Sequence, residues 1–125
     1  MSSRVYLDYC ATTPVHPNVR NAMLRAFDAD YGNPSSMHWA GKDSRQLMDQ
    51  SRMDVARGIG CHPAEIVFTS GATEADNLAL FGTLRRFPSN EAHLITSAIE
   101  HHAVLHAAQH LEQEGYSVTY LPVDE

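Results

Sequence analysis

The order of hydrophobic and polar positions predicts four helices along the chain. The first runs from residue 17 to about 27, where Val19, Met23 and Phe27 share one helical face. Pro17 suits the first turn of that helix, because its missing N–H has no partner there in any case. The other three helices are predicted over residues 37–57, 73–84 and 103–114.

Polar caps and glycines mark the ends of the helix predicted at 37–57. Ser36 can accept a hydrogen bond from an amide of the first turn, so it is the expected N-cap. Gly58 and Gly60 are expected to end the helix, because glycine tolerates the left-handed conformation that closes a helix.

Short apolar runs between the helices predict β-strands at residues 66–68 and 94–96, and the alternation of side chains along residues 116–121 predicts a third strand there. The resulting order, β-α-β-α-β, predicts an α/β fold with a mainly parallel, doubly wound sheet and flanking helices. Three strands leave both edges of the sheet open, so we expect the front part of a larger α/β domain. Residues 1–62 then form an N-terminal segment with two helices, and residues 63–125 form the beginning of the large domain.

Composition narrows the class of protein. With 43% hydrophobic and 19% charged residues, the 125-residue chain is expected to fold as an ordinary globular protein. It has no apolar run long enough for a membrane span. A net charge of −6 without a basic patch argues against nucleic-acid binding. Two cysteines make no disulfide scaffold, and a reduced, cytoplasmic setting is the default expectation.

The segment from Ser70 to Glu74 is the first candidate site. A strand leads into a glycine turn that opens a helix, and free amides at a helix start favour an anion such as phosphate. Gly71 and Ala72 let the phosphate approach the backbone, and the Thr73 hydroxyl adds a donor. The alternative is an ordinary capped helix, with Ser70 or Thr73 as the cap. Neither a P-loop nor the dinucleotide fingerprint matches.

The second candidate site follows the strand at 94–96. Ligands of parallel sheets bind beyond the carboxyl ends of the strands, and His101 stands there. A histidine can stack on an aromatic ring and can move protons near neutral pH. A surface or helix-capping role is the alternative. His102, His106 and His110 recur every four residues, which is a metal-ligand spacing, but no further ligand is evident and we expect a solvated face without metal.

Two further features remain open or carry no chemistry by sequence alone. The turn-rich loop at Asn33 is either a simple turn or a polar loop that faces a substrate. Cys10 is expected to be a small buried thiol, since no activating base can be assigned to it. Cys61, next to His62, is expected to lie in a loop without a catalytic role. Lys42 is the only lysine, beside eight arginines.

Several of these segments, in this order, resemble one family. The chain is similar to cysteine desulfurases of the NifS/IscS type, which are pyridoxal-phosphate enzymes of fold type I in the class V aminotransferase group. The matching stretches run almost from Val5 to Asp124. They are Tyr6-Leu7-Asp8 with Ala11-Thr12-Thr13-Pro14, Gly32-Asn33-Pro34-Ser35-Ser36 with His38, Glu65-Ile66-Val67-Phe68-Thr69-Ser70-Gly71-Ala72-Thr73-Glu74 with Asp76-Asn77-Leu78-Ala79, and Glu100-His101 with Ala103-Val104 and the stretch from Leu111-Glu112 to Leu121.

The resemblance implies a role for each candidate residue. Ala72 and Thr73 match the positions that hold the phosphate of pyridoxal 5'-phosphate. His101 matches the histidine that stacks on the pyridine ring and transfers protons, and Asn33 matches a loop residue near the substrate. The implied reaction converts L-cysteine to L-alanine and leaves persulfide sulfur on the enzyme for iron–sulfur cluster or thiocofactor assembly. A sulfur-acceptor or scaffold protein and a homodimeric state are implied as well.

The residues that would form covalent bonds in such an enzyme are not among these motifs. The family has no Schiff-base residue at the position of Lys42, and neither Cys10 nor Cys61 matches the persulfide cysteine. We therefore expect the chain to be a fragment that is inactive alone and active only as part of a complete or complemented enzyme. The alternatives are another class V enzyme with a different amino-acid substrate, and a non-catalytic remnant that binds partners through open sheet edges.

Overall fold

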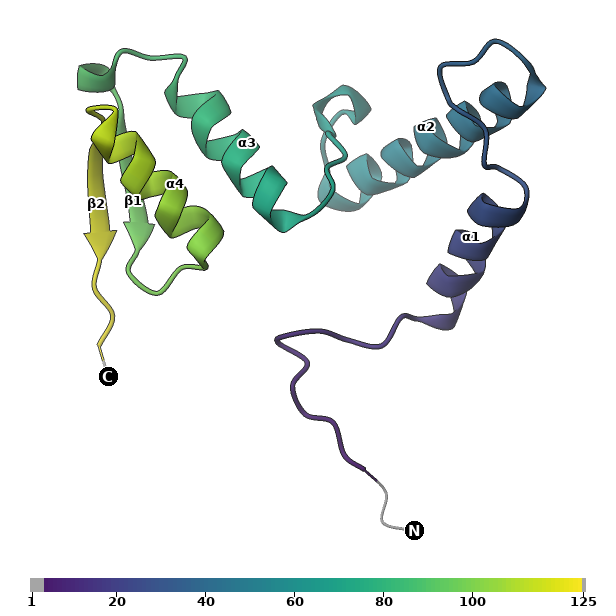
Figure 1. Ribbon diagram of the computed structural model, residues 1–125, viewed down its shortest axis with the longest axis horizontal. Coiled ribbons are helices and arrows are strands. Elements are labelled where there is room, and N and C mark those ends of the chain that lie inside the picture. The colour runs from purple at the N-terminus through teal and green to yellow at the C-terminus, as the bar shows by residue number, and fades with distance from the viewer. Residues whose placement is uncertain (1–3, 125) are drawn as a thin grey trace. The chain divides into compact units, whose positions relative to one another are not determined.

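The computed structural model describes residues 4–124 and divides into two compact units, which are considered separately (Figure 1). The N-terminal unit is Met1–Ile66 and the C-terminal unit is Val67–Glu125. Residues 1–3 and 125, at the outer ends of the two predicted domains, lie outside the described residues. The domain boundary predicted after residue 62 stays a prediction.

The N-terminal unit holds helix α1 (Pro17–Asp28), helix α2 (Trp39–Ile59) and the short 3-10 helix η1 (Pro63–Glu65). The prediction of α1 is confirmed, with Pro17 in its first turn. His16 caps it, since its Nδ1 accepts a hydrogen bond of 3.2 Å from the Asn18 amide. The apolar face of α1 is exposed within the described structure, and Phe27 is 72% exposed.

Helix α2 differs from the prediction at both ends. It begins at Trp39 with His38 as N-cap, so Ser36 is not the cap. Ser36 lies three residues before the first helical residue, in the preceding turn, where its amide donates to the Asn33 carbonyl oxygen at 2.9 Å. Gly60 ends the helix at φ 74°, as predicted, but Gly58 lies within the helix.

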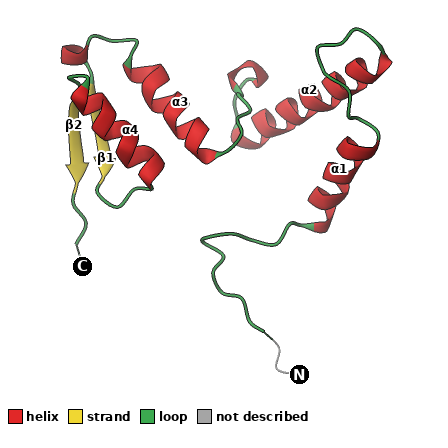
Figure 2. Ribbon diagram, in the orientation of Figure 1, coloured by secondary structure: helices red, strands yellow, loops and turns green. Residues whose placement is uncertain are grey.

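The C-terminal unit is a mixed α/β arrangement around a small parallel sheet (Figure 2). Along the chain come α3 (Ala72–Leu84), η2 (Ser89–Glu91), β1 (His93–Ser97), α4 (His102–Gln113) and β2 (Ser117–Leu121). The two strands pair in parallel, with Ile95 opposite Thr119. This confirms the helices predicted at 73–84 and 103–114 and the last two predicted strands within a residue or two.

The strand predicted at residues 66–68 is wrong for the described structure. These residues belong to no strand, and the sheet has two strands in the part of the chain described. A strand needs a neighbour to pair with, and the Ile66 carbonyl instead accepts a hydrogen bond from the Arg52 guanidinium of α2. Val67 is 64% exposed. The apolar run at residues 66–68 was therefore not sufficient evidence for a strand, because it gives no information about a pairing partner.

Packing in the C-terminal unit is centred on α4, which contacts both α3 and β2. Leu111 of α4 is fully buried. At the far ends of the two helices, the Arg85 guanidinium donates two hydrogen bonds to the Glu114 carboxylate, one of 3.1 Å. These contacts hold α3 and α4 side by side, and they thereby fix the position of one helix N-terminus relative to the other.

No helix in the described part of the chain combines the length and the hydrophobicity that crossing a bilayer requires.

Candidate functional site

The start of α3 presents unpaired backbone donors. Gly71 is the N-cap and has extended backbone, but it has no side chain to accept a hydrogen bond. The first bond of the helix runs from the Ala75 amide to the Gly71 carbonyl. The amides of Ala72, Thr73 and Glu74 consequently have no acceptor among the described residues. Free amides and the positive end of the helix dipole together favour an anion here.

The turn before α3 is held by side chains that leave those amides free. The Glu74 carboxylate accepts hydrogen bonds from the Ser70 amide at 2.7 Å and the Ser70 hydroxyl at 2.6 Å. The two bonds, the hydroxyl one first, hold the pKa of the Glu74 carboxyl below its ordinary value. The Thr69 hydroxyl donates to the Gly71 carbonyl at 3.1 Å. Ser70 therefore stabilises the turn through Glu74. Neither Ser70 nor Thr73 is the side-chain cap of α3, so the alternative of an ordinary capped helix is wrong.

His101 is the N-cap of α4. Its Nδ1 accepts a hydrogen bond of 3.1 Å from the Ala103 amide. A neutral imidazole that accepts at Nδ1 carries its proton at Nε2, so Nε2 is a donor. The helix-capping role considered for His101 is thus confirmed, and it occupies Nδ1 alone. The other ring nitrogen has no partner among the described residues and is available to a ligand.

The two candidate segments meet in one hollow, although they are distant in the sequence. We call it the α3–α4 hollow: about 450 Å³, lined by Thr73, Asn77 and Phe81 of α3 and, on the other side, by His101, His106 and His110. Ala72 stands at the helix start beside it. Asn77 was not among the residues predicted for the site, and its side-chain amide donates to the Thr73 carbonyl at 2.7 Å. Asn77 follows Thr73 by four residues and so lies on the same helical face, which is the sequence feature that could have predicted its place in the site.

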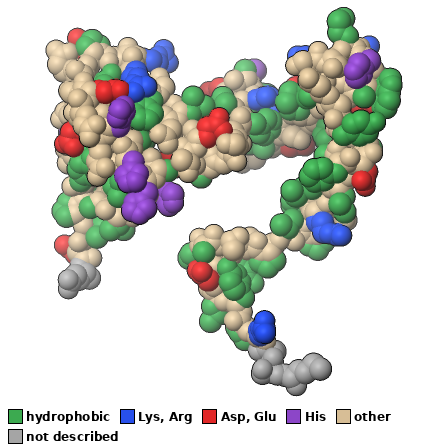
Figure 3. All heavy atoms as spheres, viewed as in Figure 1, with side chains coloured by type: hydrophobic (Ala, Val, Ile, Leu, Met, Phe, Trp, Pro, Cys, Tyr) green, Lys and Arg blue, Asp and Glu red, His purple; other side chains and the backbone are tan. Residues whose placement is uncertain are grey.

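His102, His106 and His110 form an exposed stripe on α4, as predicted, and this stripe borders the same hollow (Figure 3). The rings of His102 and His106 stack with centroids 5.4 Å apart. His110 meets the edge of Phe81 at 5.8 Å and lies 3.2 Å from the Glu114 carboxylate. Among residues 4–124, no group of three or more potential ligands is arranged to hold a metal ion.

Asn33 lies in the N-terminal unit, on an exposed turn between α1 and α2. Its Oδ1 accepts a hydrogen bond from the Ser35 amide at 2.9 Å, and its carbonyl accepts one from the Ser36 amide at 2.9 Å. The side-chain NH₂ of Asn33 is left as a free donor within the described structure. The turn interpretation is confirmed, and the substrate-facing role stays a prediction.

The two cysteines differ from each other. The expectation of a buried thiol at Cys10 is wrong: Cys10 is exposed, because it lies in a segment without helix or strand that packs little against the rest of its unit. The loop position of Cys61 is confirmed. His62 is engaged as the cap of η1, with Nδ1 accepting from the Ala64 amide at 3.2 Å and its own amide donating to Glu65.

Comparison with known proteins places these residues in a family. The aminotransferase class-V family model matches residues 5–125. The chain is 48% identical to a putative cysteine desulfurase, IscS 1, of Bacillus subtilis, over 98% of this chain and 32% of that protein. It is 44% identical to the cysteine desulfurase IscS of Dictyoglomus turgidum, over 99% of this chain and 32% of that protein.

Solved structures agree with the sequence relatives. A NifS-like protein superposes with a TM-score of 0.89 at 40% identity, over 98% of this chain and 33% of that chain. A structure described as SspA in complex with cysteine matches with a TM-score of 0.83 at 40% identity, over 93% of this chain and 33% of that one.

The chain spans about a third of the length of the curated relatives it matches. The similarity nevertheless covers nearly all of this chain, includes both candidate segments, and agrees between sequence and structure. The resemblance to IscS- and NifS-type cysteine desulfurases is thereby confirmed, and the chain belongs to the class V aminotransferase family.

Proposed function

We propose that this chain supplies the phosphate-binding, ring-contacting and substrate-side residues of a pyridoxal-phosphate-dependent cysteine desulfurase. The observation that carries the proposal is that Thr73 and His101 line the same hollow. A helix start with free amides and an imidazole beside it is the combination that a phosphorylated aromatic cofactor needs. The family, whose members use pyridoxal phosphate, supports the same cofactor.

The residues present fit such a cofactor. The free amides of Ala72 and Thr73 and the Thr73 hydroxyl can donate hydrogen bonds to its phosphate, which the α3 dipole also attracts. The His101 ring stands at the same hollow and can lie against a pyridine ring. The bound cofactor would supply an electron sink for bond breaking at the substrate amino acid.

The proton chemistry of His101 follows from its cap. While Nδ1 accepts from the Ala103 amide, Nε2 of the neutral ring carries the proton and can donate a hydrogen bond to a ligand in the hollow. Transfer of a proton from His101 requires the imidazolium form, in which Nδ1 is protonated and no longer accepts from the Ala103 amide. Proton transfer by His101 is therefore coupled to release of the cap, whereas the capped neutral ring acts as a hydrogen-bond donor at Nε2.

The rest of the proposed reaction needs groups outside the candidate site. L-Cysteine is the proposed substrate, with Asn33 close to it, and L-alanine and persulfide sulfur are the proposed products. The Schiff-base lysine, the persulfide cysteine and a sulfur-acceptor protein would come from elsewhere in a complete, homodimeric, cytoplasmic enzyme. We accordingly expect no desulfurase activity from these 125 residues alone.

The first experiment is to purify the polypeptide that carries these residues from its native source and measure its intact mass and its release of alanine and sulfide from cysteine. A mass well above 13.9 kDa together with cysteine-dependent release supports the proposal. A 13.9 kDa polypeptide that co-purifies with a lysine-bearing partner also supports it. Turnover of an unrelated amino acid in place of cysteine contradicts it, as does turnover by the 125-residue chain alone.

A matched pair of histidine variants tests the site in the active protein. His101→Ala should lower kcat by roughly 10²–10⁴-fold, the usual contribution of a general acid or base. His62→Ala is the control, because His62 makes the same Nδ1 cap at η1 but does not line the α3–α4 hollow. Equal loss of activity in both variants would mean that capping, and not chemistry, explains His101.

A further inference from the structure

We propose that Gly41 and Ser44, in the first turns of α2, are positioning residues that hold the loop at residues 30–36 so that Asn33 meets the substrate. The substrate part of this inference rests on the proposed function. The packing part rests on contacts within the N-terminal unit alone. We call residues 30–36 the Asn33 loop.

Gly41 allows the Asn33 loop to lie directly against α2. It is buried within the helix. A Cβ added at Gly41 would stand 2.7 Å from the Asn33 carbonyl oxygen and would overlap the Ser36 carbonyl oxygen. Both obstacles are backbone atoms, so no side-chain rotation can relieve the contact. Any side chain at position 41 must therefore push the backbone of Asn33 itself.

The approach is equally close from the loop side. A Cβ added at Gly32 would overlap the carbonyl oxygen of Ala40, the residue before Gly41. Neither glycine has a positive φ, so what both positions require is space and not left-handed backbone. Each glycine thus faces backbone of the opposite segment, Gly41 that of the loop and Gly32 that of α2, so both sides of the contact lack a side chain that would block it.

Ser44 ties the beginning of the loop to the same helix. Its side chain is 6% exposed, and its hydroxyl lies 2.7 Å from the Asp30 carbonyl oxygen and 3.1 Å from the Ala40 carbonyl oxygen. A serine inside a helix commonly donates only to its own preceding turn. The shorter contact of Ser44 is instead with the loop, which fixes where the loop leaves α1.

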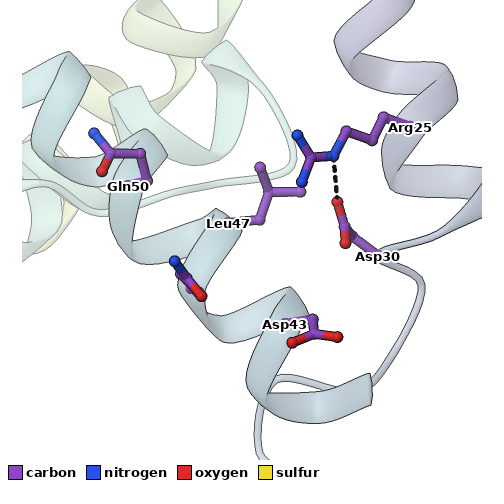
Figure 4. Close-up of a pocket in the computed structure, with 6 residues that line it drawn as sticks. Arg25, Asp30, Asp43, Leu47 and Gln50 are labelled. Carbon is purple, nitrogen blue, oxygen red and sulfur yellow. Dashed lines mark hydrogen bonds and ion pairs between the residues drawn. The ribbon is translucent and has the colours of Figure 1, made fainter. Parts of the chain in front are cut away.

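The same loop residue is held from α1 by an ion pair. The Arg25 Nε donates to the Asp30 carboxylate at 3.0 Å, and the Asp30 side chain is only 11% exposed (Figure 4). Asp30 thus has its carbonyl bonded to α2 and its carboxylate bonded to α1. The base of the Asn33 loop is anchored on both sides, beside a hollow of about 350 Å³ that Asp43 and Gln50 also line.

Within the loop, the anchors determine what Asn33 can offer. Its Oδ1 and its carbonyl are both occupied by loop amides, those of Ser35 and Ser36. The free group is the side-chain NH₂, a donor suited to an oxygen of an amino-acid substrate. Because Gly41 contacts the Asn33 carbonyl, displacing the backbone at that point shifts the NH₂ group directly.

The test compares Gly41→Ala with Gly58→Ala in the active, cofactor-loaded protein. Both substitutions add one methyl group to α2, but the space around Gly58 is open. Gly41→Ala should lower kcat/KM for cysteine by about 10²-fold, since misplacement by about 1 Å costs that much, and mainly through KM. The visible absorbance of the bound cofactor should stay unchanged. Gly58→Ala should retain the wild-type KM.

Hydrogen exchange supplies a readout that does not depend on turnover. The Ser35 and Ser36 amides bond to Asn33, so their exchange should accelerate at least tenfold in Gly41→Ala and stay unchanged in Gly58→Ala. Unchanged KM and unchanged exchange in a folded Gly41→Ala protein would overturn the proposal. So would a Gly58→Ala protein that loses as much cysteine affinity as Gly41→Ala.

A milder pair keeps the test open if Gly41→Ala fails to fold. Ser44→Ala removes the bond to Asp30 without adding atoms, and Ser51→Ala removes a comparable 2.8 Å bond to the Leu47 carbonyl inside α2. Only Ser44→Ala should raise KM and speed the exchange of the Ser35 and Ser36 amides. Equal effects of the two variants would overturn the proposal. A wild-type protein that releases no alanine from cysteine would refute the proposed function, and the substrate role with it, while the exchange ratio still reports on the packing.

Discussion

Replacing Leu111 by alanine should loosen α4, which carries the cap residue of the candidate site at its start. Leu111 is the one large side chain that is fully buried in the described structure. Leucine-to-alanine changes at such sites cost about 3 kcal/mol, because transfer energy is lost and a cavity remains. Every 1.4 kcal/mol is a factor of ten in an equilibrium, so the opening equilibrium of α4 should rise about a hundredfold.

Native-state hydrogen exchange of the α4 amides, in the polypeptide that carries these residues, measures this opening directly. Gln109→Ala is the control on the same helix, because Gln109 is exposed and glutamine and alanine have similar helix propensities. The reasoning would be refuted if Leu111→Ala changed exchange in α4 by less than about threefold, or if Gln109→Ala changed it as much. Either result would mean that α4 does not use Leu111 as its packing centre.

Four further outcomes are expected. Thr73→Ala should weaken cofactor retention about tenfold through loss of one phosphate donor, measured by dialysis and absorbance, whereas Thr83→Ala at the other end of α3 should not. The hydrogen bond from Arg85 holds the pKa of the Glu114 carboxyl below 4.5. The contribution of this bridge to folding stability is therefore fully present above pH 4.5 and is lost as the pH falls through the lowered pKa. Glu114→Gln should therefore reduce the fall in the thermal unfolding midpoint that occurs as the pH is lowered below 4.5. Gly58→Ala should stabilise α2 by about 1 kcal/mol in denaturant unfolding, from helix propensity in open space. Nitrogen-15 NMR should find the neutral His101 ring protonated at Nε2, and a proton at Nδ1 would contradict the observed cap.

The elements that the sequence predicts well are those whose signal is local. α1 has a proline in its first turn, and α2 ends at a left-handed glycine, Gly60. The alternation of β2 is also visible in its burial, since Val118 and Tyr120 are less exposed than their neighbours. Each of these depends on residues within a few positions of one another, so pattern and structure agree.

The predictions that fail depend on hydrogen-bond and packing partners that composition and local chemistry do not identify. The run at 66–68 has the composition of a strand, but a strand exists only when another one pairs with it. Ser36 has the chemistry of a cap, but its amide is taken by a turn that begins at Asn33. Cys10 has the apolar character of a buried residue, but burial requires packing that the N-terminal segment does not make.

The candidate site shows the same division. The free amides at Ala72 and Thr73 follow from a glycine turn that opens a helix, and the sequence predicts them. That Thr73 and His101 line one hollow follows from the side-by-side packing of α3 and α4, which spacing alone does not reveal. The role inferred for Gly41 was hidden for a further reason: a glycine needed for space, with ordinary φ, looks in sequence like any helix-interior glycine.

The residues proposed for the site would act without forming covalent bonds. Amides and a hydroxyl of α3 can donate to an anion, His101 caps a helix and can donate from Nε2, and Asn33 offers an NH₂ group. A desulfurase also needs an amine to carry its cofactor and a thiolate to receive sulfur. The resemblance to the family implies that Lys42 is not this amine and that neither Cys10 nor Cys61 is this thiolate. In the proposed function the residues of the site bind and orient cofactor and substrate, and the covalent steps fall to other groups. The mass and the partner composition of the native polypeptide therefore decide the proposed function before any point mutation does.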